Sequence, residues 1–189
     1  MPTHSSILLI EDSPGECELF RLALAQTGLD VALYTEQDAE AALRFLEVKA
    51  KAEVKVPAST TGENQADELL SHINSCSTSA STLTSYPCSA STGDRSGLPS
   101  LILLDLHLCG QNGCDLLKRL RSDARFAAIP VVVFTTSDDQ TDLARCYASG
   151  ANGYVVKPGT FAELVHCTGD LCRYWLTWNR SLRMAETRC

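Results

Sequence analysis

The sequence has no long apolar run, no excess of positive charge and no closely spaced pair of cysteines. No apolar stretch approaches the length that crosses a membrane, and the N-terminus has neither the basic start nor the apolar core of a signal peptide. The formal net charge of −7 leaves no basic excess to neutralise phosphates, which argues against nucleic acid as the main partner. We therefore expect a cytoplasmic protein that binds neither membranes nor nucleic acid.

The nine cysteines lack the spacing of a zinc site and of a disulfide framework. No C-x-x-C pair occurs and the total is odd. Cys17, Cys146, Cys167 and Cys172 fall within helical patterns, where small buried thiols pack as apolar side chains do. We expect none of the cysteines to bind a metal ion.

Two short aliphatic runs each end in acidic residues. The run Ile7–Ile10 leads into Glu11 and Asp12, and the run Leu101–Leu104 leads into Asp105. Uniformly aliphatic runs are typical of strands buried on both faces of a parallel sheet, so the acids should meet at the carboxyl edge of that sheet. Three carboxylates gathered there repel one another unless a cation neutralises them, and oxygen-only ligands suit Mg²⁺.

The remaining pattern predicts a single α/β domain. At 189 residues, with 44% hydrophobic content, the chain can bury a real core. Five strand–helix units in sequence predict a doubly wound five-stranded parallel sheet with right-handed crossovers and helices on both faces. The predicted strands are 6–11, 31–35, 101–106, 131–135 and 153–157, and the predicted helices are 15–27, 38–49, one beginning after Gly113, 139–149 and one beginning at Thr160.

One long segment interrupts the alternation of strands and helices. Residues 51–99 show no strong period, and 13 of the 26 residues in 71–96 are Ser or Thr. This composition predicts a disordered insertion between the second helix and the third strand, at the sheet edge opposite the acids. The domain would then consist of residues 5–50 and 100–172, followed by an extension over 173–189.

Five motifs occur in order on the predicted elements. They are Glu11-Asp12, Leu103-Leu104-Asp105-Leu106, Gly110-Gln111-Asn112-Gly113, Ile129-Pro130-Val131-Val132-Val133-Phe134-Thr135-Thr136 and Gly150-Ala151-Asn152-Gly153-Tyr154-Val155-Val156-Lys157-Pro158. Together they resemble a bacterial two-component response regulator receiver domain. The resemblance implies a flavodoxin-like fold with strand order 2-1-3-4-5, and a signalling protein rather than an enzyme. Among receivers, the chain is most similar to the small stand-alone regulators that partner phytochromes, which implies a sensor histidine kinase, such as a phytochrome, as its partner.

The resemblance also implies which residues carry a phosphoryl group and a metal ion. Asp105 would be the phosphoacceptor. Asp12 and Asp105 would ligate Mg²⁺ directly, Glu11 would act through a metal-bound water, and the backbone carbonyl of His107 would be a further ligand. Two positions depart from the family pattern: Glu11 replaces the commoner Asp, and Cys109 stands where proline is usual.

Three further residues have roles only by this resemblance. Thr135 and Lys157 would contact the phosphoryl oxygens, with the bond between Lys157 and Pro158 in the cis form. Tyr154 would be the aromatic switch that turns inward as Thr135 moves toward the phosphoryl group. The alternative for Tyr154 is an ordinary half-buried strand residue.

Two other functions stay open on the sequence. A receiver-like interaction module that no longer uses phosphorylation would have the same fold, although the retained acids, Thr135 and Lys157 oppose it. A phosphohydrolase of the haloacid dehalogenase type also uses an Asp nucleophile at a strand end. That class needs a second Asp two residues later, where this chain has His107.

The C-terminal part carries an apolar stripe. Trp175, Trp178 and Leu182 are spaced by three and four residues, which predicts one face of a continued last helix. We expect this face to contact another chain, with a homodimer formed through the fourth strand, the fifth strand and the last helix as one possibility. The alternative for Trp175 is packing on its own domain.

Overall fold

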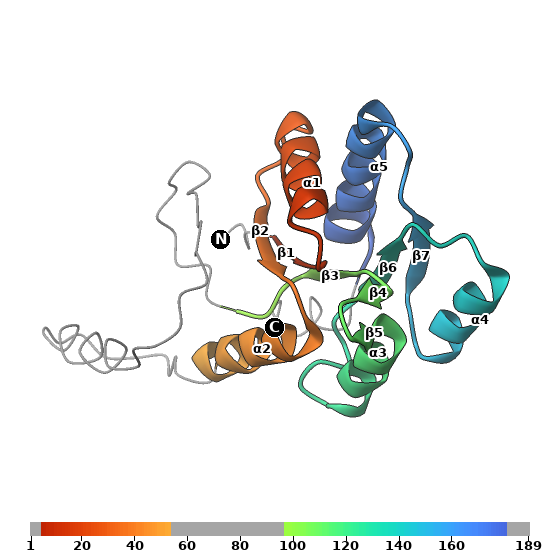
Figure 1. Cartoon of the computed structure of the whole chain (residues 1–189). Coiled ribbons are helices and arrows are strands. Elements are labelled where there is room, and N and C mark those ends of the chain that lie inside the picture. Colours follow the sequence, from red (N-terminus) through yellow and green to blue (C-terminus); the bar gives the residue numbers. More distant parts are fainter. Residues whose placement is uncertain (1–4, 54–96, 181–189) are drawn as a thin grey trace, which may run out of the picture.

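The computed structural model describes residues 5–53 and 97–180. Within these ranges a five-stranded parallel sheet lies between two layers of helices (Figure 1). The strand order is β2-β1-β3-β6-β7, so the predicted doubly wound sheet of order 2-1-3-4-5 is confirmed, since β6 and β7 are the fourth and fifth strands of this sheet. The strands are Ser6–Ile10 (β1), Ala32–Glu36 (β2), Leu101–Leu104 (β3), Val131–Thr135 (β6) and Gly153–Val156 (β7).

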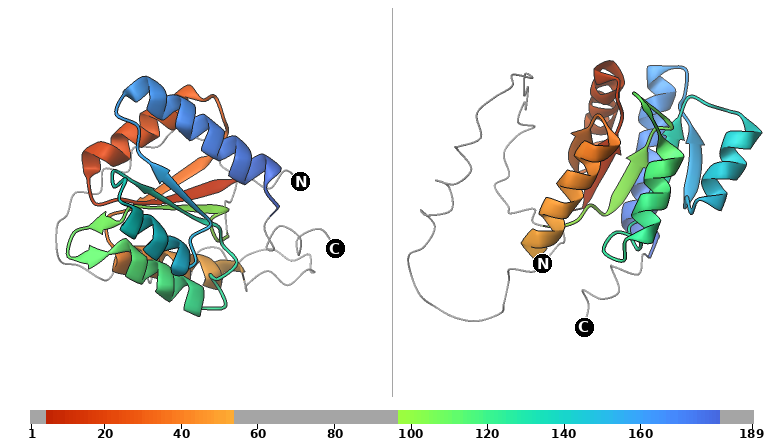
Figure 2. Two further views of the ribbon diagram at one scale, coloured as in Figure 1. Left: turned by 90° about the vertical axis from the view of Figure 1, so that its right-hand side faces the viewer. Right: turned by 60° about the horizontal axis from the view of Figure 1, so that its bottom comes forward.

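Two helices cover one face of the sheet and three cover the other. Figure 2 shows α1 and α5 together on one side, and α2, α3 and α4 on the opposite side. The helices are Pro14–Gln26 (α1), Ala39–Glu53 (α2), Gly113–Ser122 (α3), Gln140–Ala148 (α4) and Phe161–Arg173 (α5). Each lies within a few residues of its predicted range, except that α2 extends four residues past its predicted end at Lys49.

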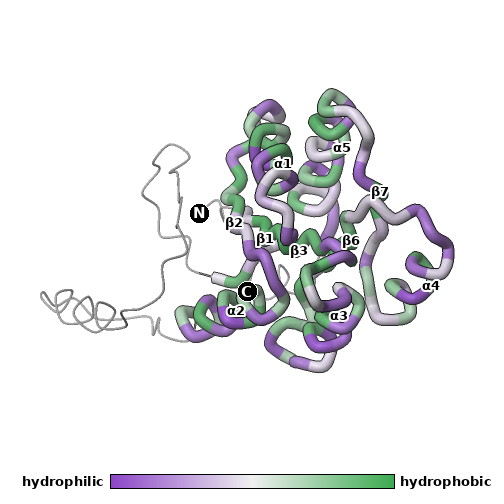
Figure 3. Tube along the Cα trace, in the orientation of Figure 1, coloured by the Kyte–Doolittle hydropathy of each residue, from purple (hydrophilic) through white to green (hydrophobic). Residues whose placement is uncertain are grey.

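The central strands supply apolar side chains to both layers. Every residue of β1, β3 and β6 is buried, and the hydropathy colouring of Figure 3 shows β1 and β3 as continuous hydrophobic segments. Because neighbouring side chains on a strand point to opposite faces, Ile7 and Leu9 pack with α1 and α5, whereas Leu8 and Ile10 pack with α2 and α3. This two-sided burial explains why the strands are aliphatic throughout.

A short hairpin that the sequence did not predict follows β3. The two-residue strands His107–Leu108 (β4) and Gln111–Asn112 (β5) pair antiparallel, with Gly110 at a φ of 75° in the turn. The hairpin returns the chain so that α3 begins directly against the end of β3, and a Cβ on Gly113 would lie 2.3 Å from the Asp105 carbonyl oxygen. Only glycine fits this approach.

The predicted continuation of the last helix takes a different form in the described residues. The α-helix ends at Arg173, a π-helical turn covers Tyr174–Trp178 (η1), and the backbone becomes extended at Asn179. A π turn has more residues per turn than an α-helix, so Trp175 and Trp178 no longer share one face. Trp175 packs onto the core beside α5, whereas the Trp178 side chain is 75% exposed. Leu182 lies outside the described residues.

Two further predictions concern the peptide bond before Pro158 and the long insertion. No cis peptide bond occurs in residues 5–53 or 97–180, so the cis form expected for Lys157–Pro158 is wrong. The predicted disordered insertion covers residues 51–99. Residues 51–53 belong instead to α2, and residues 54–96 lie outside the described ranges. The domain boundaries remain a prediction. The flanking chain does lie where expected, because Ser100 donates a backbone hydrogen bond to Ser6 at the start of β1, opposite the acidic edge. None of the described helices is long and apolar enough to cross a membrane.

We expect Gly113→Ala to lower the free energy of unfolding by about 1–3 kcal/mol, because the added Cβ would clash with the Asp105 carbonyl oxygen and the Leu106 backbone. Urea denaturation measures the change. Gly159→Ala is the matched control, since nothing lies within 4 Å of a Cβ at that position, and it should change stability by less than about 0.5 kcal/mol. A Gly113→Ala protein as stable as the wild type would contradict the close approach.

Candidate functional site

Three carboxyl groups meet at the carboxyl edge of the sheet. The strands β1 and β3 are parallel neighbours with Ile10 opposite Leu104, so the residues that follow them leave the sheet side by side. Glu11, Asp12 and Asp105 each place one carboxylate oxygen within 4.8 Å of the others. Glu11 and Asp105 are only 2% and 6% exposed, and Asp12 is half-buried.

The ammonium group of Lys157 reaches into this cluster from the end of β7. Its Nζ lies 2.5 Å from a carboxylate oxygen of Glu11 and 3.6 Å from one of Asp105. The backbone of Lys157 is fixed to the neighbouring strand, since its N–H donates to the Thr135 carbonyl at 2.7 Å. Sheet pairing therefore places the lysine beside the acids.

The sequence did not single out Glu16, which is a further partner of Lys157 at 2.5 Å. Ser13 caps α1 and accepts a hydrogen bond from the Glu16 backbone, which places Glu16 in the first turn of the helix. An acid in the first turn commonly interacts with the helix dipole, so nothing in the residue pattern assigns Glu16 another role. Only the packing of α1 against the sheet edge brings it to Lys157.

The electrostatics of the cluster leave an excess of negative charge. Burial raises the pKa of Glu11 above its usual value, although Lys157 and the Ser13 N–H oppose that rise. Burial acts to lower the pKa of Lys157, but hydrogen bonds to Glu11 and Glu16 and the charge of Asp105 outweigh it, so the pKa of Lys157 is raised. Lys157 therefore stays cationic, and it is one ammonium facing the carboxyl groups of Glu11, Asp12, Asp105 and Glu16.

The residues fit a hard divalent cation. All the donors in the cluster are carboxylate oxygens, which Mg²⁺ prefers, and Mg²⁺ needs only one or two protein carboxylates because it retains several waters. A hollow of about 170 Å³ lies next to the cluster, and its lining includes Glu11, Glu16 and Lys157. Glu11, Asp12 and Asp105 are the residues that would hold the ion.

Thr135 and Tyr154 belong to a hydrogen-bonded network beside the acids. Thr135 is completely buried at the end of β6, and its hydroxyl oxygen accepts a hydrogen bond of 3.4 Å from the Ser137 N–H. The half-buried Tyr154 donates its hydroxyl to the Ser137 carbonyl at 2.9 Å, and the Ser137 hydroxyl donates to Asp142 of α4 at 2.8 Å. Ser137, which the sequence did not identify, thus links Thr135, Tyr154 and α4.

The other predicted residues lie away from the acids. The side chain of His107 is exposed on β4, which leaves only its backbone as a candidate ligand. Trp175 packs beside Gly153 at the start of β7, which is the opposite edge of the sheet from the acids. The structure therefore brings together Glu11, Asp12, Asp105, Thr135 and Lys157, and leaves the C-terminal tryptophans in a separate region.

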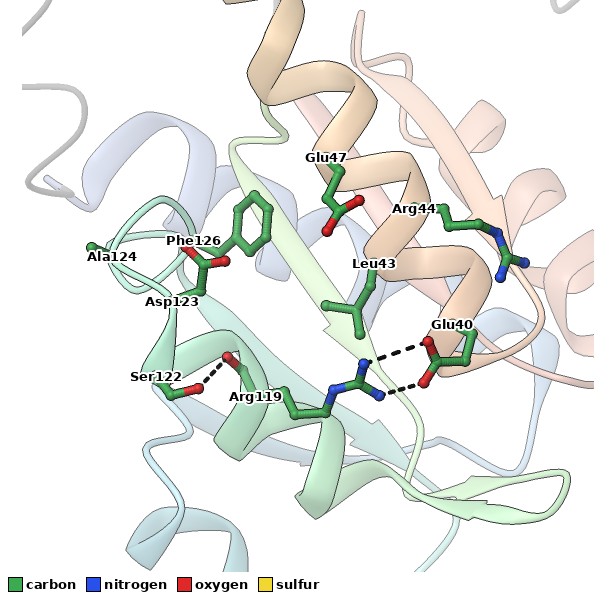
Figure 4. A pocket seen from close by; sticks show the side chains of 9 residues that line it. All are labelled: Glu40, Leu43, Arg44, Glu47, Arg119, Ser122, Asp123, Ala124 and Phe126. Atoms are coloured by element: carbon green, nitrogen blue, oxygen red, sulfur yellow. Dashed lines mark hydrogen bonds and ion pairs between the residues drawn. The ribbon is translucent and has the colours of Figure 1, made fainter.

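A second hollow, of about 540 Å³, lies between α2 and α3 (Figure 4). Its charges are paired at the surface: Arg119 bridges to Glu40, with both side chains about half exposed. Exposed pairs of this kind contribute little energy, and none of the predicted site residues lines this hollow. This hollow is a solvent-exposed groove between two helices.

Comparisons with known proteins agree with this geometry. The probable methanogenesis regulatory protein FilR2 of Methanothrix harundinacea is 44% identical over 89 residues, which are 47% of this chain and 57% of that protein. The alignment thus spans little more than half of that relative. The phosphorylated cyanobacterial phytochrome response regulator RcpA superposes with a TM-score of 0.65 at 24% identity, covering 95% of this chain and 99% of that one.

A second similar structure carries a metal ion. The receiver domain of sensor histidine kinase PA1611 from Pseudomonas aeruginosa, with magnesium coordinated in its active-site cleft, superposes with a TM-score of 0.53 at 17% identity, covering 92% of this chain and 98% of that one. Identities below 25% show the shared fold alone. Residues 72–168 match the family described as response regulator receiver domain, a range that excludes Glu11 and Asp12 but contains Asp105, Thr135 and Lys157. The chain therefore belongs to the response regulator receiver domain family.

Proposed function

We propose that this chain is a response regulator that accepts a phosphoryl group from a sensor histidine kinase onto Asp105 in a Mg²⁺-dependent reaction. The observation that carries the proposal is the convergence of the buried Asp105 with two further acids and the ammonium of Lys157 at one edge of the sheet. The receiver family uses such a site for phosphoryl acceptance, and the similar RcpA structure is described as phosphorylated.

The chemistry needs one nucleophile and several positive or donor groups. A carboxylate oxygen of Asp105 would attack the phosphorus of a phosphohistidine, so that an O–P bond forms while the N–P bond to the imidazole breaks. The Leu106 N–H donates to Asp105 Oδ1 at 2.7 Å and orients the carboxylate, which leaves Oδ2 on the side of Lys157. When bound by the three acids, Mg²⁺ supplies charge neutralisation to the phosphoryl oxygens.

Lys157 and Thr135 would contact the phosphoryl oxygens directly. In the structure Lys157 is held between Glu11 and Glu16, so it must exchange part of these contacts for the incoming group. The Thr135 hydroxyl is held only by a long 3.4 Å hydrogen bond from Ser137. A shift of Thr135 toward Asp105 would therefore disturb Ser137, and with it the Tyr154 hydroxyl and α4. This network is the route by which the phosphoryl group would change the surface of β7 and α4.

Two alternatives are less well supported. A receiver-like module that does not use phosphorylation would have no need of Lys157 buried among acids, since burying such charges costs free energy unless they serve a function. A phosphohydrolase of the haloacid dehalogenase type needs an acid two residues after the nucleophile. That position is His107, whose side chain is exposed on β4.

The proposed partners are a sensor histidine kinase, of which a phytochrome is one candidate, and a second copy of this chain. The phytochrome assignment is supported by the likeness to the bacteriophytochrome response regulator RtBRR, which superposes with a TM-score of 0.54 at 28% identity, covering 94% of this chain and 83% of that one. The homodimer is supported by exposed apolar side chains near the edge strand β7 and around η1: Val156 at 44%, Tyr174 at 54% and Trp178 at 75% exposure. Large exposed apolar side chains are enriched at protein interfaces.

We expect the wild-type chain to gain the mass of one phosphoryl group when incubated with Mg²⁺ and a small phosphodonor such as acetyl phosphate. Asp105→Asn should abolish this gain, because the amide cannot act as the nucleophile. Asp115→Asn is the matched control, since Asp115 is exposed on α3 and paired with Lys118, and it should be phosphorylated as the wild type is. Intact-mass spectrometry measures both. A wild type that is never phosphorylated would support the module reading, and turnover of varied phosphoesters would support the hydrolase.

We expect Mg²⁺ to stabilise the folded chain, because the ion would bind the clustered carboxylates of the native state only. At about ten times its dissociation constant the free energy of unfolding should rise by about 1.4 kcal/mol. Asp12→Asn should remove most of this increase, whereas Asp115→Asn should keep it. Thermal unfolding with and without Mg²⁺ measures the difference. An equal Mg²⁺ effect in both variants would show that the ion acts elsewhere.

We expect Trp178→Ala to weaken a homodimer, because the change removes the most exposed large apolar side chain in the described ranges. Sedimentation velocity at several concentrations measures the oligomeric state. Val48→Ala is the control. Val48 is 67% exposed and lies on α2, which follows β2, and β2 and β7 are at opposite ends of the sheet. A dimer that Trp178→Ala leaves unchanged would contradict the proposed interface.

A further inference from the structure

Two buried cysteines from different helices face each other beside the sheet. Cys114 lies in the first turn of α3 and Cys146 lies in α4, 32 residues later, and their sulfur atoms are 3.0 Å apart. Both are recorded as free thiols. A disulfide bond is about 2.05 Å long, so a relative movement of about 1 Å would bring the sulfurs to bonding distance. The sequence predicted ordinary packing for Cys146 and gave no reason to pair it with Cys114.

The surroundings of the pair combine an apolar pocket with one cation. Cys114 and Cys146 pack with Leu106 and Val133, and both cysteines are at most 1% exposed. The guanidinium of Arg145 interacts with Cys114, an interaction that raises the pKa of Arg145. Burial raises the pKa of the Cys146 thiol to about 12, so this thiol keeps its proton at neutral pH.

The helix that carries Cys146 buries little of its surface against the rest of the domain. Among the residues of α4 (Gln140–Ala148), Cys146 is the one whose side chain is buried. A helix with so little buried apolar surface opens at low free-energy cost, which gives small oxidants transient access to both sulfurs. A covalent bond between Cys146 and Cys114 would remove that opening.

We propose that Cys114 and Cys146 form a reversible disulfide bond that fixes α4 to α3, with a hydroperoxide as the oxidant. The Cys114 sulfur attacks the outer oxygen of the peroxide. An S–O bond forms, the O–O bond breaks, and the thiol proton goes to the departing oxygen, so hydrogen peroxide yields a sulfenic acid and one water. The Cys146 sulfur then attacks the sulfenic sulfur, and the hydroxyl group leaves as a second water with the Cys146 proton. The two sulfurs lose two electrons to the peroxide, and a dithiol reverses the reaction.

The consequence is a restraint on the surface formed by α4. Ser137, Asp142 and Tyr154 connect the start of α4 to β6 and β7, so a covalent tie at Cys146 limits movement of this whole segment. The disulfide itself does not depend on phosphorylation. It can be tested without any phosphodonor, so its failure is distinguishable from failure of the proposed function.

The test uses the full chain carrying Cys109→Ser, which leaves Cys114 as the single cysteine in its proteolytic fragment. After treatment with hydrogen peroxide and blocking of the remaining thiols under denaturing conditions, the chain is digested with trypsin and chymotrypsin. Cleavage after Arg145 and Tyr147 separates Cys146 from the two cysteines of α5. We expect a fragment containing Cys114 joined to the dipeptide Cys146-Tyr147, which disappears after treatment with dithiothreitol.

Two variants and one further measurement complete the test. Cys146→Ala in the same background should leave Cys114 without this link, whereas Cys167→Ser should keep the link unchanged. Amide hydrogen exchange in α4 should slow at least about tenfold in the oxidised chain and recover on reduction, whereas exchange in α5 should stay the same. This readout remains informative if a cysteine variant folds poorly, because the Cys109→Ser chain serves as its own control before and after oxidation.

Two results would overturn the proposal. The first is recovery of Cys114 and Cys146 as blocked free thiols under peroxide conditions that oxidise the exposed Cys109 of the wild-type chain. The second is a linked fragment in a chain whose α4 exchange rate is unchanged, which would show that the bond does not fix the helix.

Discussion

The contact between Lys157 and the buried acids is the interaction on which the functional edge of this protein depends. Glu11 and Asp105 leave neighbouring strands at the same level and are almost completely buried, so their charges would repel strongly without compensation. Lys157 supplies that compensation from a third strand, and its position follows from the pairing of β7 with β6. One cation shared among several carboxylates also leaves negative charge for a divalent ion to neutralise.

Around this edge the helices differ in how much of their surface is buried against the sheet. At Gly113 the start of α3 packs directly against the backbone of Asp105 and Leu106, where no larger residue fits. This contact restricts the position of the Asp105 backbone. By contrast, α4 is held by one buried side chain and by hydrogen bonds through Ser137. If Asp105 is phosphorylated as proposed, the change is most easily transmitted to the side of the domain that buries the least surface. The cysteine pair joins α3 to α4 at this side.

Much of the fold could be predicted from the sequence because its patterns are local. Aliphatic runs followed by acids identified β1 and β3, and alternating strand and helix patterns identified the sheet and its layers. The hairpin β4–β5 could not be predicted, since two-residue strands have no detectable period. The π turn after Arg173 was also missed, because a helical spacing of tryptophans continues through it while the backbone geometry changes. That change separates Trp175, which packs inward, from Trp178, which stays exposed.

The sequence by itself determined the chemical inventory: acids at two strand ends, a threonine and a lysine at two others, and a fold that gathers strand ends at one edge. It could do so because parallel strands converge on that edge whatever the details of packing. The tertiary structure decided which side chains meet across different elements. It brought Glu16 to Lys157, Ser137 between Thr135 and Tyr154, and Cys114 to Cys146. Such contacts depend on how helices lie against the sheet, and neither residue spacing nor composition specifies that arrangement.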